Sequence, residues 1–149
     1  MPKAENYLPF IKSCIQERYF DRQGKPFSDL REWERRFGDS AYKRVAEATL
    51  ADGTWVSTVW LGLNHNWGAG PPLIFETMVF PSKDGPFSEQ ETDRYATEAE
   101  ALAGHAAIVK KWAAKVRRKL ARMVKREAVL REVEARTKPV ARRLLSLEG

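Results

Sequence analysis

The stretch that decides the fold is KRVAEATLADGTWVSTVWLGL, residues 43 to 63. Apolar residues alternate imperfectly with polar ones over residues 43–50, and residues 54–63 are rich in the β-branched and aromatic side chains that favour strands. Asp52-Gly53 lies between them and has the composition of a two-residue type I′ turn, in which both residues take a positive φ. The stretch therefore predicts a β-hairpin.

A second apolar run follows at residues 73–80, where Glu76 and Thr77 are the only polar residues. A run of this kind is typical of a central strand, so we expect it to pair with residues 54–63. Residues 65–72 carry glycines, which allow a positive φ, and prolines, which exclude helix, and they predict a shaped loop. Residues 93–96 are a candidate fourth strand.

Helices are predicted before the strands. Residues 4–18 are loosely amphipathic, with Pro9 limiting the first turn. Residues 19–27 then suit a short hairpin or an irregular turn, and a helix from Ser28 or Asp29 through Phe37 has apolar residues on one face.

A long helix is predicted after the strands. Thr97 and Glu100 have the spacing of a capping box, in which each side chain accepts a hydrogen bond from the other residue's amide. No proline follows Gly104 until Pro139, so the helix can run to about Arg136, roughly 55 to 60 Å. That length exceeds the width of a small domain, so the distal half must project, pack on a partner or bend back.

These elements predict a single α+β domain. We expect a mostly antiparallel sheet of three to five strands, with helices on one face and a long basic C-terminal helix. Residues 1–109 form the α+β core with its N-terminal helix, and residues 110–149 form a basic helical extension of the same domain.

The charge is unevenly distributed along the 149 residues. The formal net charge is +6, yet residues 1–109 carry 12 Lys and Arg against 16 Asp and Glu, whereas residues 110–126 carry nine basic residues and no acid. A mildly acidic body beside a strongly basic segment indicates a localised contact with phosphate or carboxylate groups.

The basic residues gather on one side of the predicted helix when residues are placed about 100° apart. Seven of them, which we call the basic arc, are Lys111, Lys115, Arg118, Lys119, Arg122, Lys125 and Arg126. A solvated face is one interpretation, but seven like charges repel one another, so the arc favours anion binding. Nucleic-acid backbone is the commonest such anion, although an acidic protein groove or a membrane surface would meet the same electrostatics.

The cysteine count and the hydropathy exclude other classes of protein. Cys14 is the only cysteine, so an intrachain disulfide and a cysteine-rich metal site are both excluded. No apolar run approaches the ~20 residues that span a bilayer, and residues 1–24 lack a signal-peptide core. We therefore expect a cytoplasmic protein without a membrane partner.

Part of the chain resembles a known family. The motifs are residues 56–65 (VSTVWLGLNH), residues 71–80 (PPLIFETMVF) and residues 94–97 (RYAT) leading into Gly104-His105. They resemble small uncharacterised proteins of bacteriophage and prophage genomes, which pair a strand ending in Gly-Leu-Asp-His with a Phe-Glu-Thr-Met strand. The resemblance covers about residues 19–109 and not the basic segment, and Asn64 stands where that family has Asp. It implies an accessory protein of a phage or mobile element, a class that includes many inhibitors of host defence, and it implies no activity.

The two histidines define a candidate pocket. His65 and His105, with Glu76 and Arg94, would supply two imidazoles, a carboxylate and a guanidinium. Such a set could perform acid–base chemistry on a phosphoester, hold a phosphate, or ligate a metal through two histidines and one carboxylate. The alternative is structural: His105 is a core histidine, His65 caps the loop, and Glu76 forms an ion pair with Arg94 or His65.

These observations predict a non-catalytic, phage-type accessory protein, for example an anti-CRISPR inhibitor, whose basic helix contacts nucleic acid or a host nucleoprotein. No catalytic residue, metal or cofactor is predicted. One alternative is a small-nucleotide binder or phosphodiesterase that uses the candidate pocket. A second is a structural phage protein that forms homo-oligomers through the C-terminal helix.

Overall fold

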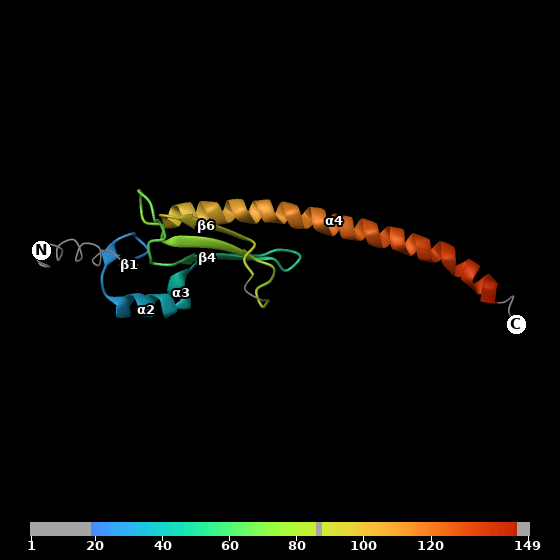
Figure 1. Cartoon of the computed structure of the whole chain (residues 1–149), viewed down its shortest axis with the longest axis horizontal. Coiled ribbons are helices and arrows are strands. Elements are labelled where there is room, and N and C mark those ends of the chain that lie inside the picture. The colour runs from blue at the N-terminus through green and yellow to red at the C-terminus, as the bar shows by residue number, and fades with distance from the viewer. Residues whose placement is uncertain (1–18, 86–87, 146–149) are drawn as a thin grey trace, which may run out of the picture.

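The structure is a computed structural model that describes residues 19–85 and 88–145 (Figure 1). The helix predicted over residues 4–18, with Cys14, lies outside the described residues. The side chains of the helix are described as far as residue 138.

A four-stranded antiparallel sheet forms the centre of the domain. Its strands are β3 (Arg44–Thr49), β4 (Trp55–Trp60), β5 (Phe75–Phe80) and β6 (Glu91–Tyr95), which lie side by side in that order. β4 and β5 are the central strands, in register from the Trp55–Phe80 pair to the Trp60–Phe75 pair. The structure thus confirms the predicted α+β class, the hairpin, the central strand and the fourth strand.

The turn between β3 and β4 differs from the predicted one. The chain reverses through Ala51, Asp52 and Gly53, with a hydrogen bond of 2.9 Å from Gly53 N to Leu50 O and another of 2.8 Å from Leu50 N to Thr54 O. Gly53 has a φ of +89°, but none of the described non-glycine residues has a positive φ, which excludes type I′ geometry at Asp52. The longer connection places only the glycine in the left-handed region, which glycine adopts without steric cost.

A second, two-stranded sheet and two short helices precede the main sheet. β1 (Tyr19–Phe20) and β2 (Pro26–Phe27) pair as the predicted short hairpin. α2 (Leu30–Gly38) begins after Asp29, whose carboxylate accepts hydrogen bonds from the amides of Arg31 and Glu32. α3 (Ser40–Lys43) follows directly, with Asp39 as its N-cap.

The sequence predicted that the helices would lie on one face of the sheet, but they lie on opposite sides of it. Figure 1 shows α2 and α3 on the side of the sheet opposite the long helix α4 (Glu98–Leu145). Trp33 of α2 instead stacks with Tyr19, at 5.6 Å between ring centroids, and donates a hydrogen bond to Leu61 O. Trp33 thus packs against the first hairpin, and Phe37, which stacks on Trp33, lies over the side of the sheet that α4 leaves uncovered.

The long helix α4 starts as predicted and ends later. The amide of Glu100 donates to Thr97 Oγ1 at 3.2 Å, and the amide of Thr97 donates to the Glu100 carboxylate at 3.1 Å, which completes the capping box. The helix has 48 residues, or about 72 Å, and continues through Pro139 to Leu145, beyond the predicted end at Arg136. A single proline removes one backbone hydrogen bond and need not end a long helix.

The strand register divides the sheet into two faces. Val56, Thr58 and Trp60 alternate along β4 on the face that packs against α4, and they are buried with Phe75 and Val79 of β5. Trp55, Ser57 and Val59 lie on what we call the second face. The two buried clusters of the core, around Trp60 and around Val56, both include residues of α4.

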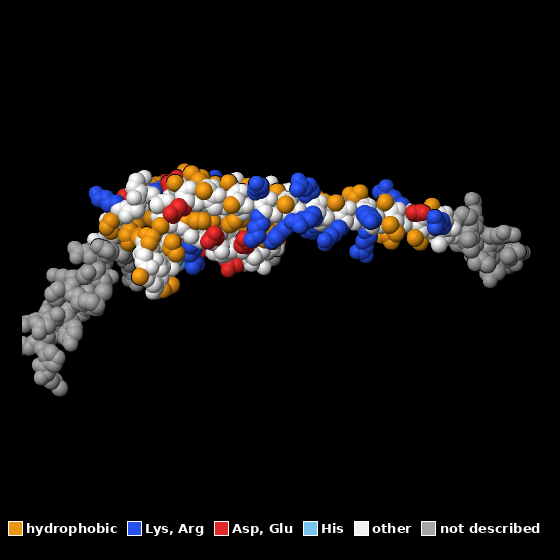
Figure 2. All heavy atoms as spheres, turned by 90° about the horizontal axis from the view of Figure 1, so that it is seen from above, with side chains coloured by type: hydrophobic (Ala, Val, Ile, Leu, Met, Phe, Trp, Pro, Cys, Tyr) orange, Lys and Arg blue, Asp and Glu red, His pale blue; other side chains and the backbone are white. Residues whose placement is uncertain are grey.

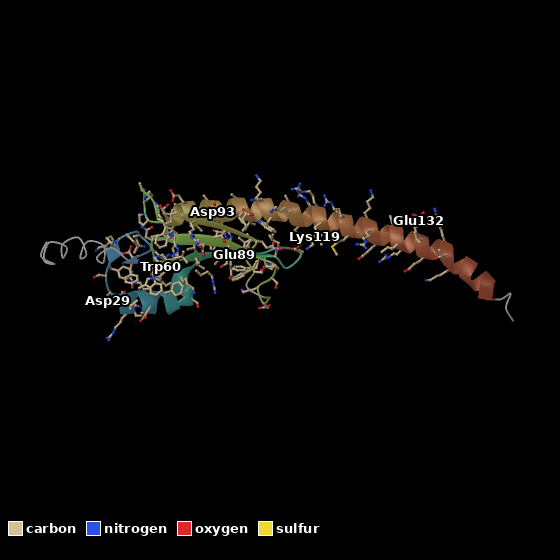
Figure 3. The ribbon with its side chains drawn as sticks, viewed as in Figure 1. Asp29, Trp60, Glu89, Asp93, Lys119 and Glu132 are labelled. Carbon is tan, nitrogen blue, oxygen red and sulfur yellow. The ribbon has the colours of Figure 1, made fainter. Side chains whose placement is uncertain are left out.

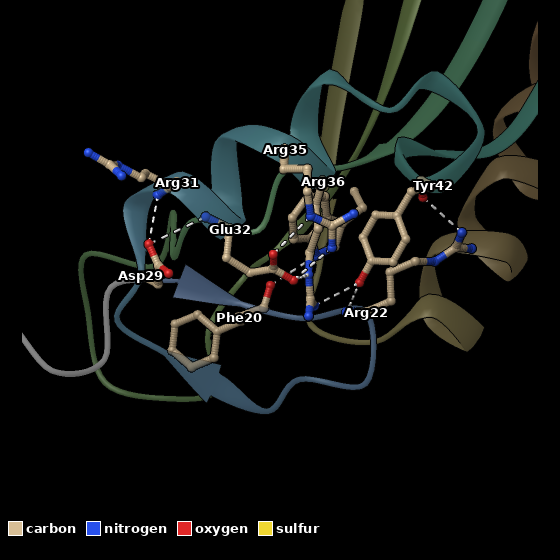
Figure 4. Close-up of polar contacts among 9 residues, drawn as sticks. Phe20, Arg22, Asp29, Arg31, Glu32, Arg35, Arg36 and Tyr42 are labelled. Atoms are coloured by element: carbon tan, nitrogen blue, oxygen red, sulfur yellow. Dashed lines mark hydrogen bonds and ion pairs between the residues drawn. The ribbon is translucent and has the colours of Figure 1, made fainter.

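Polar contacts join the turn between β1 and β2 to α2 and α3 (Figure 4), and Arg22 extends them to the first turn of α4. Arg22, in the turn between β1 and β2, forms an ion pair with Glu98 and donates a 2.9 Å hydrogen bond to Tyr42 O. Arg36 donates to the Tyr42 hydroxyl and also pairs with Glu32 at 2.7 Å. Hydrogen bonds from arginines 35 and 36 hold the pKa of Glu32 at about 2.

Candidate anion-binding surface on the long helix

The sheet holds the first half of α4 through a row of small and apolar side chains. Ala101, Ile108 and Val116 recur at helical spacing and are at most 6% exposed. Gly104 allows close approach, because a Cβ there would lie 2.2 Å from Tyr95 Oη. The direction of α4 is therefore fixed along the first part of the basic segment.

A buried polar chain joins α4 to the two central strands. Thr58 Oγ1 lies 2.8 Å from His105 Nδ1 and 2.6 Å from Thr77 Oγ1, and both threonines are fully buried. Burial lowers the pKa of His105, which favours its neutral form. His105 therefore has a structural role between helix and sheet.

Two carboxylates hold the beginning and the middle of the basic arc where α4 leaves the sheet. Lys111 Nζ donates to Glu91 at 2.6 Å, and Trp112 Nε1 donates to the second oxygen of Glu91 at 2.8 Å. Lys119 Nζ donates to Asp52 at 2.9 Å, and Figure 3 shows Lys119 at the end of the sheet. Lys111 and Lys119 are thus partly neutralised by their own domain.

The pKa values of these carboxylates reflect the contacts. The hydrogen bond from Lys111 lowers the pKa of Glu91, and the bond from Trp112 adds to it against the opposing effect of burial. Burial raises the pKa of Asp52, but hydrogen bonds from Thr54 and Lys119 outweigh it, so that the net pKa is lowered. Both groups therefore stabilise the fold most above their unfolded pKa values, and the contribution is lost as the pH falls.

The other residues of the arc have no carboxylate partner among the described residues. Lys115 Nζ lies 3.9 Å from the centroid of the Trp112 ring, and Arg118 Nε donates to Ala114 O within the helix. Arg122, Lys125 and Arg126 form no ion pair or hydrogen bond within the described part of the chain, and all three are exposed. Figure 2 shows the Lys and Arg side chains along the middle of α4.

A shallow groove of about 540 Å³ runs along this part of the helix. Its lining consists of five arginines and lysines together with one methionine: Lys115, Arg118, Lys119, Arg122, Met123 and Arg126. A linear polyanion could lie along this groove, because the cations follow the helix axis for three turns.

The arc weakens the isolated helix. Like charges at i,i+3 and i,i+4 each cost about 0.2–0.5 kcal/mol, and the arc contains several such pairs. Among the residues that the structure describes, only Lys111 and Lys119 gain a carboxylate in return. The remaining repulsion would be relieved by a bound anion, and this favours a binding role over a solvated face.

The helix beyond the sheet also exposes apolar residues. Every described residue from 121 to 138 is exposed. Met123 is 50% exposed, Leu130 52% and Val133 51%. They follow the row of Val116 past the sheet, where nothing in the described structure covers them.

The structure does not bring together the four residues of the candidate pocket. Glu76 and Arg94 form an ion pair of 2.7 Å on the second face, the structural alternative that the sequence left open. His105 lies on the α4 face and contacts Thr58. His65 lies in the loop after β4, where its amide donates to Leu73 O at 3.0 Å. The sheet separates His105 from the Glu76–Arg94 pair, so the shared pocket is not formed.

The sequence did not assign a role to the carboxylates that anchor the arc. Asp52 was assigned only to the turn, and Glu91 was placed just outside the fourth strand. The sequence did contain a signal for these contacts. Asp52 lies at the end of the predicted hairpin and Glu91 at the start of the fourth strand, where both can face the long helix. Finding the contacts requires the register of the sheet against α4.

Comparisons with protein-family models, with curated proteins and with solved structures find no match to this chain. Within the described residues, no helix is long and apolar enough to cross a membrane. The same residues hold no cluster of three or more histidines, cysteines or carboxylates suited to a metal ion.

Proposed function

We propose that this chain is a non-catalytic accessory protein of a phage or mobile element, and that its basic arc binds nucleic acid or a nucleoprotein in the host cytoplasm. Inhibition of host defence, including CRISPR interference, is the most specific form of this proposal. The observation that carries it is a set of three exposed cations, Arg122, Lys125 and Arg126, which have no carboxylate partner among the described residues and lie on the part of α4 that leaves the sheet.

The geometry favours a polyanion over a membrane surface. A helix that binds a bilayer inserts its apolar side, but that side of α4 is buried against the sheet as far as Val116, so the sheet-bound part of the arc has no apolar side to insert, whereas Met123, Leu130 and Val133 beyond it are exposed. The cations lie beside that apolar row and remain exposed. A nucleic-acid backbone can reach them while the acidic body stays at a distance.

The separation of the candidate pocket residues leaves the phosphodiesterase alternative without support from geometry. An acid–base pair must reach the same reacting atoms, and His105 and Glu76 lie on opposite faces of the sheet.

A plaque assay tests the counter-defence proposal. The chain would be produced in bacteria whose CRISPR system targets an infecting phage, beside a variant with Arg122→Gln and Arg126→Gln. We expect plaques to return with the original chain and not with the folded variant. Absence of plaques with the original chain would refute inhibition of that system, and equal plaques with both would refute the role of the arc.

A second candidate function is oligomerisation through α4. The observation in its favour is the half-exposed row of Met123, Leu130 and Val133 on the projecting helix. Sedimentation equilibrium tests it by comparing the original chain with Leu130→Glu. We expect a concentration-dependent dimer only in the original chain, and a monomer at all concentrations would refute this candidate.

A further inference from the structure

The second face of the sheet carries a groove that the proposed function does not use. Trp55, Ser57 and Val59 of β4 point to this face, and Met78 lies beside Ser57 on β5. The groove has a volume of about 360 Å³, and residues of α2 and α3, among them Phe37, help to line it. The volume is within the range of small-molecule sites, about 300–1,000 Å³.

The floor of this groove is aromatic and apolar. Trp55 stacks on Phe80, with 5.3 Å between ring centroids. Val59 and Met78 are partly buried, so part of their apolar surface remains accessible from the groove. A flat apolar ligand would cover this surface and gain from its burial.

The rim of the groove is positively charged. Lys43, Arg44 and Lys83 line it together with one carboxylate, Glu47. Glu47 is shared by Arg44 at 3.7 Å and Lys83 at 3.4 Å, whereas Lys43 has no carboxylate partner in the described residues and lies 4.4 Å from the Phe37 ring centroid. Positive charge therefore exceeds negative charge at the rim, which favours an anionic ligand.

We propose that this groove binds a small, flat organic anion, with its apolar body against Trp55 and Met78 and its acidic group between Lys43 and Lys83. The site is independent of the basic arc, because the groove lies on the second face and α4 packs against the other face of the sheet. The ligand is identified by its chemistry: an aromatic body of about two fused rings that fits the groove volume, and one negative charge.

A pair of fluorescent probes tests the proposal. The first is 8-anilinonaphthalene-1-sulfonate, which has a flat apolar body and one negative charge. The second is N-phenyl-1-naphthylamine, which has the same aromatic body without the sulfonate. Both would be titrated into the full chain at low salt, and the dissociation constant would be taken from probe fluorescence.

Two variants locate the binding site, and a third is the matched control. Lys43→Gln with Lys83→Gln removes the rim charges, and Met78→Trp fills the groove. The control, Lys115→Gln with Arg122→Gln, removes the same number of charges from the basic arc. Circular dichroism establishes that each variant is folded, and the lysine variant decides the test if Met78→Trp fails to fold.

We expect the lysine variant to weaken sulfonate binding about tenfold and to leave binding of the neutral probe unchanged. Folded Met78→Trp should lose both probes, and the control should bind both as the original chain does. Sulfonate affinity that is unchanged in the lysine variant, or that falls only in the arc control, would overturn the proposal.

Discussion

Replacing Arg122 and Arg126 by Gln should weaken nucleic-acid binding without unfolding the domain. Both side chains are exposed and have no partner among the described residues, so their loss removes charge and no internal contact. Each phosphate contact contributes about 0.9 to the slope of log K against log salt. Loss of two contacts should therefore reduce the slope by about 1.8 and the affinity at 0.1 M salt by roughly 60-fold.

Fluorescence anisotropy of a labelled 20-base-pair DNA duplex would measure this effect, with salt varied from about 50 to 300 mM. The matched control is Lys25→Gln with Arg31→Gln, which changes the net charge equally at two exposed residues of the body. We expect the control to keep the original slope. Equal losses in both variants would show that net charge alone governs binding and would refute a localised surface.

Three further predictions concern stability and can be measured by denaturant unfolding. Gly104→Ala should destabilise the domain by about 1–3 kcal/mol, because its Cβ would clash with the Tyr95 hydroxyl; an unchanged midpoint would contradict this packing. The free energy of unfolding should fall as the pH drops below the unfolded pKa of His105, since burial lowers its folded pKa, and His105→Asn should flatten that dependence. Arg94→Met should lower the free energy of unfolding by about 1–3 kcal/mol, because it leaves the buried Glu76 carboxylate without its ion-pair partner, and the partial exposure of Arg94 limits the cost. Adding Glu76→Gln should recover part of the lost stability.

Local patterns in the sequence predicted most of the elements. The strands at residues 54–63 and 73–80 were found from β-branched and apolar content, and the start of α4 from the spacing of Thr97 and Glu100. These signals succeed because each depends on neighbours in the chain. The prediction of a type I′ turn was wrong, because Asp-Gly occurs in several turn types and only the hydrogen bonds that close the turn distinguish them.

Contacts between distant elements were harder to predict. The partner of Glu76 was narrowed to Arg94 or His65, but the choice depended on the register of β5 against β6. His105 and Glu76 are separated because they lie on opposite faces of the sheet. A shift of one residue in the strand register would place Glu76 on the same face as His105. The groove on the second face combines residues from five elements, so no stretch of sequence contains its signal.

The central claim is that the basic arc binds nucleic acid, and lysine footprinting tests it directly. Acetylation of each lysine would be measured by mass spectrometry in the free chain and in the presence of saturating duplex DNA at low salt. We predict that Lys115 and Lys125 become protected while Lys25 and Lys83 react as before. Protection of Lys25 and Lys83 to the same degree, or unchanged reactivity of Lys115 and Lys125 in the saturated complex, would contradict the proposed surface.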